Sequence, residues 1–432
     1  PDTFGFTWQL PQILKQGGVE YFVTQKLRWN DTTKFPYELF HWQAPDGTRI
    51  LSLMSAPIGE FIDPVKMANF AWEFEQKTGL PTSLWLPGVG DHGGGPTRDM
   101  LEVARRWQQS PFFPQMEFGT ALEYLEKIGG RGRGSEGVEV QGRTGEFDAT
   151  FPPSPPLPTS DAFAVWNSEL YLEYHRGCYT THADQKQHNR EAENLLYEAE
   201  LWAALATIAT GIPYPKAELE AAWKNTLFNQ FHDILPGSSI TPVFDEANDV
   251  WETVSVECWE IIAQAQRSLV RQLALPAPPH PDARLLVVFN SLNWLRTEVV
   301  QLDVWVRSEE QQAWQICNLD GTAIAQQYSH RPPGHSLHCI AFLAEQIPAV
   351  GYRAYWLCPC EAPVPQPGSL GDRSYVLENE FLRVTIDPAT GTIASMIDKI
   401  YQREILAAPG NQLQAFADAG QYWDAWNIDP NY

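Results

Sequence analysis

The run NQFHDILPGSS occupies residues 229–239 and places the imidazole of His232 next to the carboxylate of Asp233. These side chains bind divalent metal ions or transfer protons. The run follows a stretch with the apolar spacing of an amphipathic helix, and Pro236-Gly237 then turns the chain sharply. We therefore expect the pair at a helix end, where a site can be built. A helix C-cap with a histidine near the negative end of the dipole is the simpler interpretation of the same residues.

Helical patterns lie on both sides of this run. Apolar residues recur at helical spacing over residues 185–210, 215–231 and 242–273. Three such helices with short connections predict an antiparallel three-helix bundle. We assign this bundle to a middle domain over residues 161–275.

The first 128 residues alternate short β-rich runs with helical patterns. Strands are predicted at residues 19–24, 48–53 and 83–87, and helices at 64–78, 98–109 and 119–128. Repeated strand-then-helix order predicts a parallel sheet with flanking helices, so residues 1–128 are expected to form an α/β domain or part of one. Residues 129–160 are rich in glycine and proline and are predicted to be a linker or insert.

The last part of the chain is rich in β-forming residues. Strands are predicted at residues 284–289, 298–302, 353–357, 375–378 and 381–386, the last leading into a turn at 387–391. This pattern predicts the start of an antiparallel β-sandwich over residues 283–432. The expected fold class is therefore multidomain, α/β followed by α and then β.

Composition limits the partners. The 432 residues carry 53 acidic and 30 basic side chains, and the net charge of −23 argues against nucleic acid or an anionic membrane as a partner. The 17 Trp, 15 Tyr and 21 Phe residues suit a sugar-binding protein, whose aromatic rings stack on pyranose rings, although a large core also uses them. The oligomeric state stays open, and a homo-oligomer is compatible with the sequence.

The six cysteines are sparse and show no paired zinc spacing, which suits a reducing compartment and a cytoplasmic location. No apolar run has transmembrane length, and no signal peptide is visible. The sequence starts at Pro1 without a methionine and stops in an irregular stretch, so we expect a central fragment of a longer protein.

Three further segments carry reactive side chains. Asp2 precedes Phe4-Gly5 and a helical pattern, Lys26 follows the first predicted strand, and a glycine-rich run at residues 88–95 presents Asp91 and His92. The glycine run is no phosphate loop, because no Gly-Lys-Ser/Thr follows and a carboxylate would repel phosphate. Taken singly, an N-cap aspartate and a solvated strand exit explain the segments of Asp2 and Lys26 better than a functional site does, whereas a flexible turn without a role is the less favoured interpretation of the glycine-rich run.

In this order, however, the segments resemble glycoside hydrolase family 38, the zinc-dependent retaining α-mannosidases. Further matches lie at residues 169–177, 186–193, 377–379 and 423–426. The resemblance covers nearly the whole chain and rests on several independent motifs. It implies an α/β catalytic domain, a three-helix middle domain and a β-rich C-terminal region, in agreement with the patterns above.

The resemblance also implies roles for six residues. Asp2 is the expected nucleophile and a zinc ligand, His232 is a second zinc ligand, and Asp91 is the general acid/base. Phe4, Lys26 and Asp233 are expected beside the sugar. The substrate would be an oligosaccharide with α-linked mannose. A retaining glycosidase needs two carboxylates about 5 Å apart, and bound Zn²⁺ would hold sugar hydroxyls and help to distort the ring.

Some features depart from the family. Its zinc site takes two more ligands from a His-x-Asp motif in a first strand upstream of the nucleophile, and we expect no His-x-Asp here. Only two of four ligands would then be present, so we expect this chain alone to have little or no activity. His92 stands where the family usually has glycine, and the insert at 129–160 is long. Two alternatives stay open: a non-catalytic mannoside-binding or scaffold protein, and a different metal-dependent hydrolase that uses the His-Asp pair.

Overall fold

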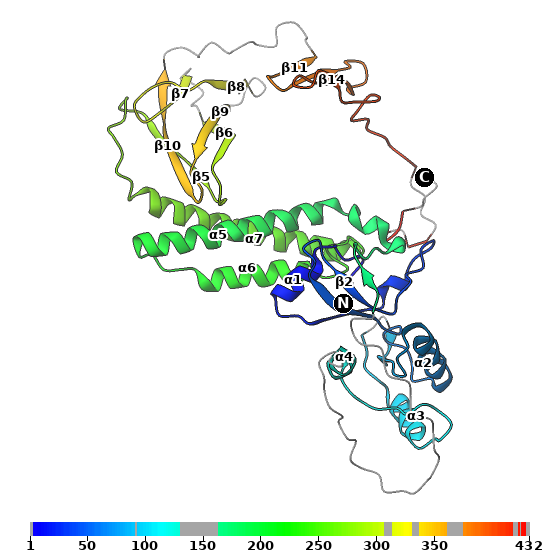
Figure 1. The fold of residues 1–432 in the computed structure, drawn as a ribbon. Helices are drawn as coiled ribbons and strands as arrows, with labels where there is room; N and C mark the ends of the chain where they lie inside the picture. Colours follow the sequence, from blue (N-terminus) through cyan, green and yellow to red (C-terminus); the bar gives the residue numbers. More distant parts are fainter. Residues whose placement is uncertain are drawn as a thin grey trace. The chain divides into compact units, whose positions relative to one another are not determined.

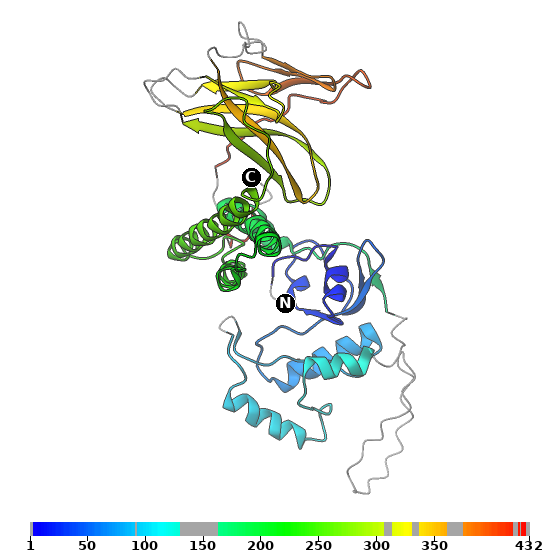
Figure 2. The same ribbon diagram turned by 90° about the vertical axis from the view of Figure 1, so that its left-hand side faces the viewer.

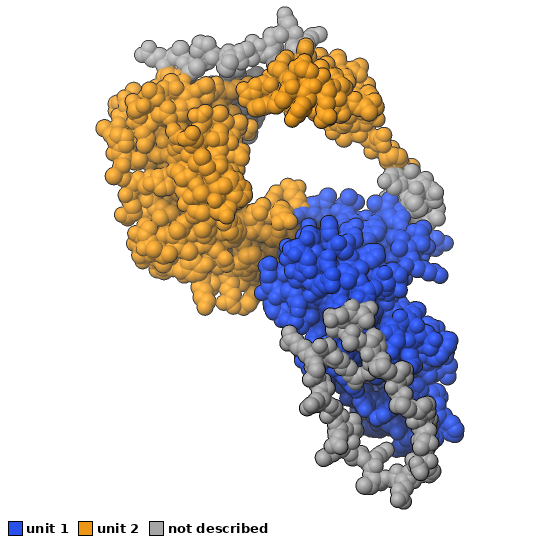
Figure 3. Space-filling model, viewed as in Figure 1, with its two compact units in different colours: residues 1–186, 230–244, 420–431 blue, residues 187–229, 245–419, 432 orange. Residues whose placement is uncertain are grey.

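The computed structural model describes residues 3–90, 93–129, 163–305, 313–330, 337–360, 375–417, 422–423 and 425–428. The chain divides into two compact units, coloured separately in Figure 3. Unit 1 contains residues 1–186, 230–244 and 420–431, and unit 2 contains residues 187–229, 245–419 and 432. The loop that carries His232 therefore belongs to unit 1, although the helix before it belongs to unit 2.

Unit 1 contains a four-stranded sheet with the order β1-β3-β2-β4, of which Figure 1 labels β2. Its strands are β1 (Tyr21–Thr24), β2 (Leu39–Gln43), β3 (Arg49–Met54) and β4 (Val165–Trp166). β1 runs parallel to β3 and β4 runs parallel to β2, but β2 and β3 are antiparallel. The expectation of a parallel sheet was therefore wrong, and the sheet is mixed. A tight turn with Gly47 at φ 87° joins β2 directly to β3, and so short a connection permits only antiparallel pairing.

Helices cover both faces of this sheet. They are α1 (Leu10–Gln16), α2 (Pro64–Thr78) and α4 (Ala121–Gly129), whereas α3 (Arg98–Gln108) packs in a separate small core with Ile62. Phe40 and Trp42 of β2 share a core with residues of α1. Leu39 of the same strand points the other way and packs with Phe74 of α2 and Leu125 of α4. This alternation along one strand is the reason that two separate cores form on the two faces.

Within residues 1–128, the structure confirms the predicted helices and two of the three predicted strands. The prediction of a strand at 83–87 was wrong. Residues 81–86 form no strand, and the segment makes a single bridge, between Pro87 and Glu60. Pro81 and Pro87 flank the apolar run, and proline has no N–H to donate to a ladder. The linker predicted at 129–160 lies, from residue 130 on, outside the described residues.

Three long helices follow, α5 (Ala183–Thr210), α6 (Lys216–Asn229) and α7 (Thr241–Val270). Figures 1 and 2 show them side by side. Buried residues from all three form one core, among them Leu196, Ala199, Leu219, Ala222 and Ile262. Their bounds agree with the predicted helices to within a few residues. Because α6 ends at Asn229, residues 230–240 form the loop that the sequence predicted.

The described strands of unit 2 pair in antiparallel fashion. The first sheet consists of β5 (Arg284–Asn290), β10 (Gly351–Cys360) and β7 (Ala313–Cys317). The second sheet consists of β6 (Arg296–Trp305), β9 (Leu337–Ile347) and β8 (Gln326–His330). Ile316 and Tyr355 of the first sheet share a core with Ile340 and Phe342 of the second. The third sheet is β11 (Val376–Glu378), β12 (Leu382–Ile386), β13 (Ile393–Asp398) and β14 (Arg403–Glu404). Within the described ranges, no helix is long and apolar enough to cross a membrane.

Candidate functional site

A cluster of rings surrounds Phe4 in unit 1. The ring of His175 stacks on Phe4, with centroids 4.3 Å apart and planes 8° from parallel. Trp29 also stacks against His175, at 5.4 Å. His175 is only 3% exposed, so its imidazole is part of the interior. Flat aromatic faces of this kind suit the apolar face of a cyclic ligand.

A buried cation lies against the same rings. Lys26 begins the short helix η1 (Lys26–Arg28), which follows the carboxyl end of β1. Its side chain is 5% exposed, and Nζ lies 4.0 Å from the ring centroid of Trp29 and 5.6 Å from that of Phe4. A desolvated ammonium gains from cation–π contact. Lys26 therefore adds positive charge and hydrogen-bond donors to the ring cluster.

The loop after α6 brings His232 and Asp233 to this cluster. The His232 ring lies edge-on to Phe4, with centroids 6.2 Å apart. His232 Nε2 is 3.6 Å from Asp233 Oδ2, and the Ser238 hydroxyl donates to Asp233 Oδ1 at 2.8 Å. Phe4, Lys26 and His232 thus come together although more than 200 residues separate the first two from the third.

The end of the chain contributes a further ring. Trp426 lies 6.5 Å from Phe4 and 6.3 Å from His175, measured between ring centroids. Its carbonyl accepts a hydrogen bond from the Gly177 N–H at 2.8 Å. A Cβ on Gly177 would lie 2.9 Å from the carbonyl oxygen of Asn427, so this close approach requires glycine.

The short helix η5 (Glu173–Tyr179) connects these parts. The Glu173 carboxylate accepts hydrogen bonds from the backbone N–H groups of Asp31, Thr32 and Thr33. Burial raises the pKa of Glu173, but these hydrogen bonds outweigh burial and hold the pKa well below its usual range. A charged Glu173 therefore ties the loop after η1 to the helix that carries His175.

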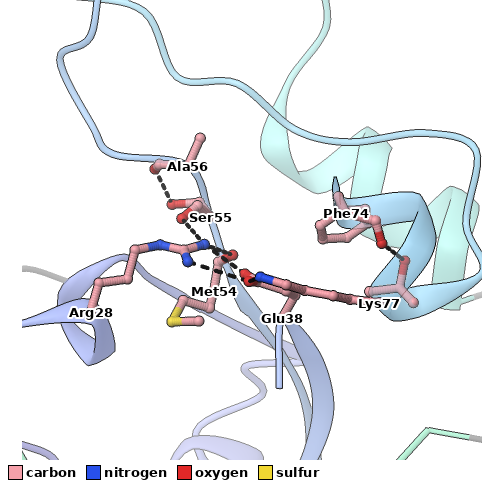
Figure 4. Close-up of polar contacts among 8 residues, drawn as sticks. Arg28, Glu38, Met54, Ser55, Ala56, Phe74 and Lys77 are labelled. Atoms are coloured by element: carbon pink, nitrogen blue, oxygen red, sulfur yellow. Dashed lines mark hydrogen bonds and ion pairs between the residues drawn. The ribbon is translucent and has the colours of Figure 1, made fainter. Parts of the chain in front are cut away.

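A buried ion network lies at the carboxyl ends of β1 and β3 (Figure 4). Glu38 is 5% exposed and accepts from Arg28 Nη2 at 2.6 Å and from Lys77 Nζ at 2.7 Å. Arg28 Nη2 also donates to the carbonyl of Ser55, just after β3. Because Arg28 is the last residue of η1, the network fixes the position of the helix that carries Lys26.

The glycine-rich run forms a closed loop. Val89 N donates to Gly94 O at 2.8 Å, and Gly90 N donates to Gly59 O at 3.0 Å. A Cβ on Gly59 would lie 2.5 Å from Gly90 N, so backbone packs directly on backbone here. Asp91 and His92 follow Gly90 in the sequence and lie outside the described residues. The other expected carboxylate, Asp2, also lies outside them.

Among the described residues, no three His, Cys, Asp or Glu side chains are grouped so that they could hold a metal ion. His232 and Asp233 form a pair only. The expectation that the chain has no His-x-Asp was wrong, because the motif occurs at residues 182–184 and 280–282. Neither copy lies in a strand, and in both copies the histidine lies within 4.0 Å of the aspartate of its own motif. The described side chains by themselves therefore do not fit a zinc ion.

Comparison with known families identifies the fold. The model of the glycosyl hydrolases family 38 N-terminal domain matches residues 1–169. The alpha mannosidase middle domain matches residues 173–269, and the family 38 C-terminal domain matches residues 377–432. The three matches follow the family's order and together cover most of the chain. The chain belongs to glycoside hydrolase family 38.

Individual alpha-mannosidases are similar over nearly the whole chain. Alpha-mannosidase 2C1 of Homo sapiens is 31% identical over 99% of this chain and 36% of its own length. Alpha-mannosidase G of Dictyostelium discoideum is 28% identical over 99% of this chain and 38% of its own length. The chain therefore spans a little over a third of these relatives.

A solved structure has a similar fold. The crystal structure of an alpha-mannosidase from Enterococcus faecalis V583 superposes with a TM-score of 0.67, at 19% identity, over 94% of this chain and 48% of that one. At this identity the likeness concerns the fold alone.

Four of the six predicted family 38 site residues lie within the described part of the chain. Phe4 and His232 belong to one cluster of rings, and Lys26 lies against that cluster. Asp233 is the next residue after His232. The sequence assigned no role to three members of this cluster, Trp29, His175 and Trp426. Their position inside segments that match the family was the only sequence signal for them.

Proposed function

We propose that this family 38 protein hydrolyses α-mannosidic bonds in oligosaccharides with retention of configuration at the anomeric carbon. The observation that carries the proposal is the convergence of Phe4, Lys26 and His232, from segments far apart in the chain, on one cluster of rings. The alpha-mannosidase relatives support the choice of mannose. Because the chain spans only part of those relatives, activity and substrate are proposals for the whole protein.

Two carboxylates carry the proposed chemistry. Asp2 attacks the anomeric carbon while Asp91 gives its proton to the leaving oxygen, which releases the first sugar product. Asp91 then takes a proton from water as the water displaces Asp2 from the anomeric carbon. Both bond exchanges occur at the same carbon, and two inversions give net retention.

The described residues bind and orient the sugar in this proposal. Phe4, held by its stack on His175, offers a flat apolar face to the ring of the substrate. Lys26 donates hydrogen bonds to sugar oxygens, and the Asp233 carboxylate accepts them from hydroxyls. Ser238 keeps Asp233 in a single orientation by donating to Oδ1.

Zinc is the proposed cofactor, on the strength of family membership and of the imidazole that His232 offers. A bound zinc ion would supply a Lewis acid that holds sugar hydroxyls. We propose Asp2 and His232 as two of its ligands; the described residues contain no group of three His, Cys, Asp or Glu side chains that could complete the site. On this proposal residues 1–432 alone turn over little or no substrate.

We further infer the domain boundaries 1–128, 129–160, 161–275 and 283–432 for the catalytic part, the insert, the middle domain and the C-terminal region. The core shared by α5, α6 and α7 supports a three-helix bundle, and the core shared by the first two sheets of unit 2 supports a β-sandwich. A cytoplasmic location is proposed from the sparse cysteines.

The test combines metal content with turnover of an aryl α-mannoside. The full-length protein and residues 1–432 are assayed together, and NMR follows the anomer that forms first. We expect zinc, turnover and the α-anomer with the full-length protein, and a loss of at least about a thousandfold in kcat for Asp91→Asn. Asp99→Asn, which changes an exposed aspartate of α3, is the matched control.

Two outcomes would overturn the proposal. Glycan binding without turnover by the full-length protein would favour the non-catalytic mannoside-binding alternative. Turnover of a non-glycosidic ester or amide, with no effect on mannosides, would favour a different metal-dependent hydrolase.

A further inference from the structure

Lys186 stands where a helix does not favour a cation. It lies in the first turn of α5, which begins at Ala183. The positive end of the helix dipole disfavours an ammonium there, whereas Asp184 in the same turn is favourable. The lysine therefore has to gain its stability from contacts outside the helix.

Those contacts are two backbone carbonyls from different segments. Lys186 Nζ donates to Thr181 O at 2.6 Å and to Leu235 O at 2.9 Å. Burial lowers the pKa of Lys186, while the neighbouring Cys178 and Asp184 act in the opposite direction. Hydrogen bonds from a charged, partly desolvated donor are stronger than bonds between neutral groups. The ammonium thus joins the segment before α5 to the loop after α6.

Two independent contacts hold the same segments together. Gly237 has φ +84°, and a Cβ on it would lie 2.5 Å from Thr181 O, so the two backbones touch directly. His182 has φ +49°, a left-handed conformation that costs energy for a residue with a side chain. Its ring stacks on Phe244, with centroids 3.9 Å apart. Residues 181–182 therefore pack directly against Gly237 and Phe244 and support residues 235–244.

The loop supported in this way carries His232 and Asp233. Leu235 and Ile234 N–H groups both bond back to Phe231 O, so residues 231–235 form one compact turn. Fixing Leu235 therefore fixes the backbone of His232 and Asp233 relative to residue 181. Lys186 and Asp233 both act on the thiol of Cys178, whose pKa burial raises to about 11, so the two charges lie in one neighbourhood.

We propose that Lys186 is a positioning residue that clamps Leu235 to Thr181 and so holds the His232–Asp233 loop against the ring cluster of Phe4. The clamp itself follows from the contacts above. Its importance for turnover rests on the proposed function.

The clamp is tested by backbone amide exchange, followed by mass spectrometry, in the full-length protein. Lys186→Met keeps the length and packing of the stem but removes the donor. We expect amides of residues 231–237 to exchange about ten- to a hundredfold faster in Lys186→Met, and Lys186→Arg to lie much closer to the wild type. Lys224→Met, at a side chain that is 72% exposed, should leave the loop unchanged. Unchanged exchange at 231–237 in Lys186→Met would overturn the clamp.

The role in the site is tested by kinetics on an aryl α-mannoside, well below the melting temperature of each variant. We expect Lys186→Met to lower kcat/KM about tenfold or more and Lys186→Arg to restore most of it. A lower melting temperature with unchanged kcat/KM would mean that Lys186 only stabilises the fold, and this result would overturn the positioning role. If the wild type hydrolyses no mannoside, the proposed function fails, while the exchange result still decides the clamp.

Discussion

The imidazole of His175 lies parallel to the phenyl ring of Phe4, with 4.3 Å between the ring centroids and 8° between the planes. More than 170 residues separate the two along the chain. Phe4 is expected beside the sugar, and it is two residues after the proposed nucleophile. On the proposed function, His175 is thus a buried side chain that sets the orientation of a ring next to the reacting carbon.

The first prediction concerns this stack. His175→Ala removes one face of support from Phe4, and an aromatic pair of this kind contributes about 0.5–1.5 kcal/mol beyond its buried area. We expect KM for an aryl α-mannoside to rise about three- to tenfold, with a smaller change in kcat. His175→Phe keeps a ring, so its KM should stay near that of the wild type. Equal effects of the two substitutions would show that the stack does not matter for binding.

The second prediction concerns the network in Figure 4. Arg28→Met leaves the buried Glu38 with Lys77 as its remaining ion-pair partner. Breaking a buried ion pair lowers the free energy of unfolding by about 3–5 kcal/mol. Because the Arg28 side chain is 30% exposed, we expect Arg28→Met to lower it by about 2 kcal/mol. The measurement is the free energy of unfolding of the full-length protein by chemical denaturation. Lys66→Met, which breaks an exposed pair with Glu60, should cost less than about 0.5 kcal/mol.

The third prediction concerns Gly177. A methyl group there would lie 2.9–3.0 Å from backbone atoms of Trp426 and Asn427, so Gly177→Ala must push that segment away. We expect a cost of about 1–3 kcal/mol and faster limited proteolysis within residues 422–428. In the control, Gly119→Ala, the methyl group would meet only the flexible carboxylate of Glu123. Identical cleavage patterns for both variants would contradict the contact.

The fourth prediction concerns alkaline pH. Burial raises the pKa of Tyr124 from 10.0 to about 12, although the side chain of Thr82 acts in the opposite direction. The folded state therefore keeps this proton at a pH where the unfolded chain has lost it. The stability from Tyr124 is complete below pH 10 and is lost as the pH rises towards 12. Denaturation midpoints measured across this window should fall less steeply for Tyr124→Phe than for the wild type.

The helices were predictable because their signals are local. The helix predicted at residues 64–78 matches α2 at both ends. The Asp63 side chain accepts from the N–H groups of Val65 and Lys66, and Gly79 adopts the left-handed conformation that ends a helix. Start and stop signals of this kind need no partner elsewhere in the chain.

The strands were less predictable because a strand needs a partner. Residues 83–86 have an apolar strand-like composition but pair with no strand. The two-residue strand β4 exists only through its pairing with β2. The direction of β2 depends on the turn at Gly47, and the prediction of a parallel sheet missed it.

Residues 229–239 alone determined that an imidazole and a carboxylate follow a helix and precede a sharp turn, because helix periodicity and Pro-Gly chemistry act over a few residues. Only the tertiary structure decided which side chains surround that pair. Phe4, His175 and Trp426 meet there through packing between segments hundreds of residues apart, and Lys186 fixes the loop through backbone carbonyls that any residue types could supply. Contacts of this kind leave no local pattern in the sequence.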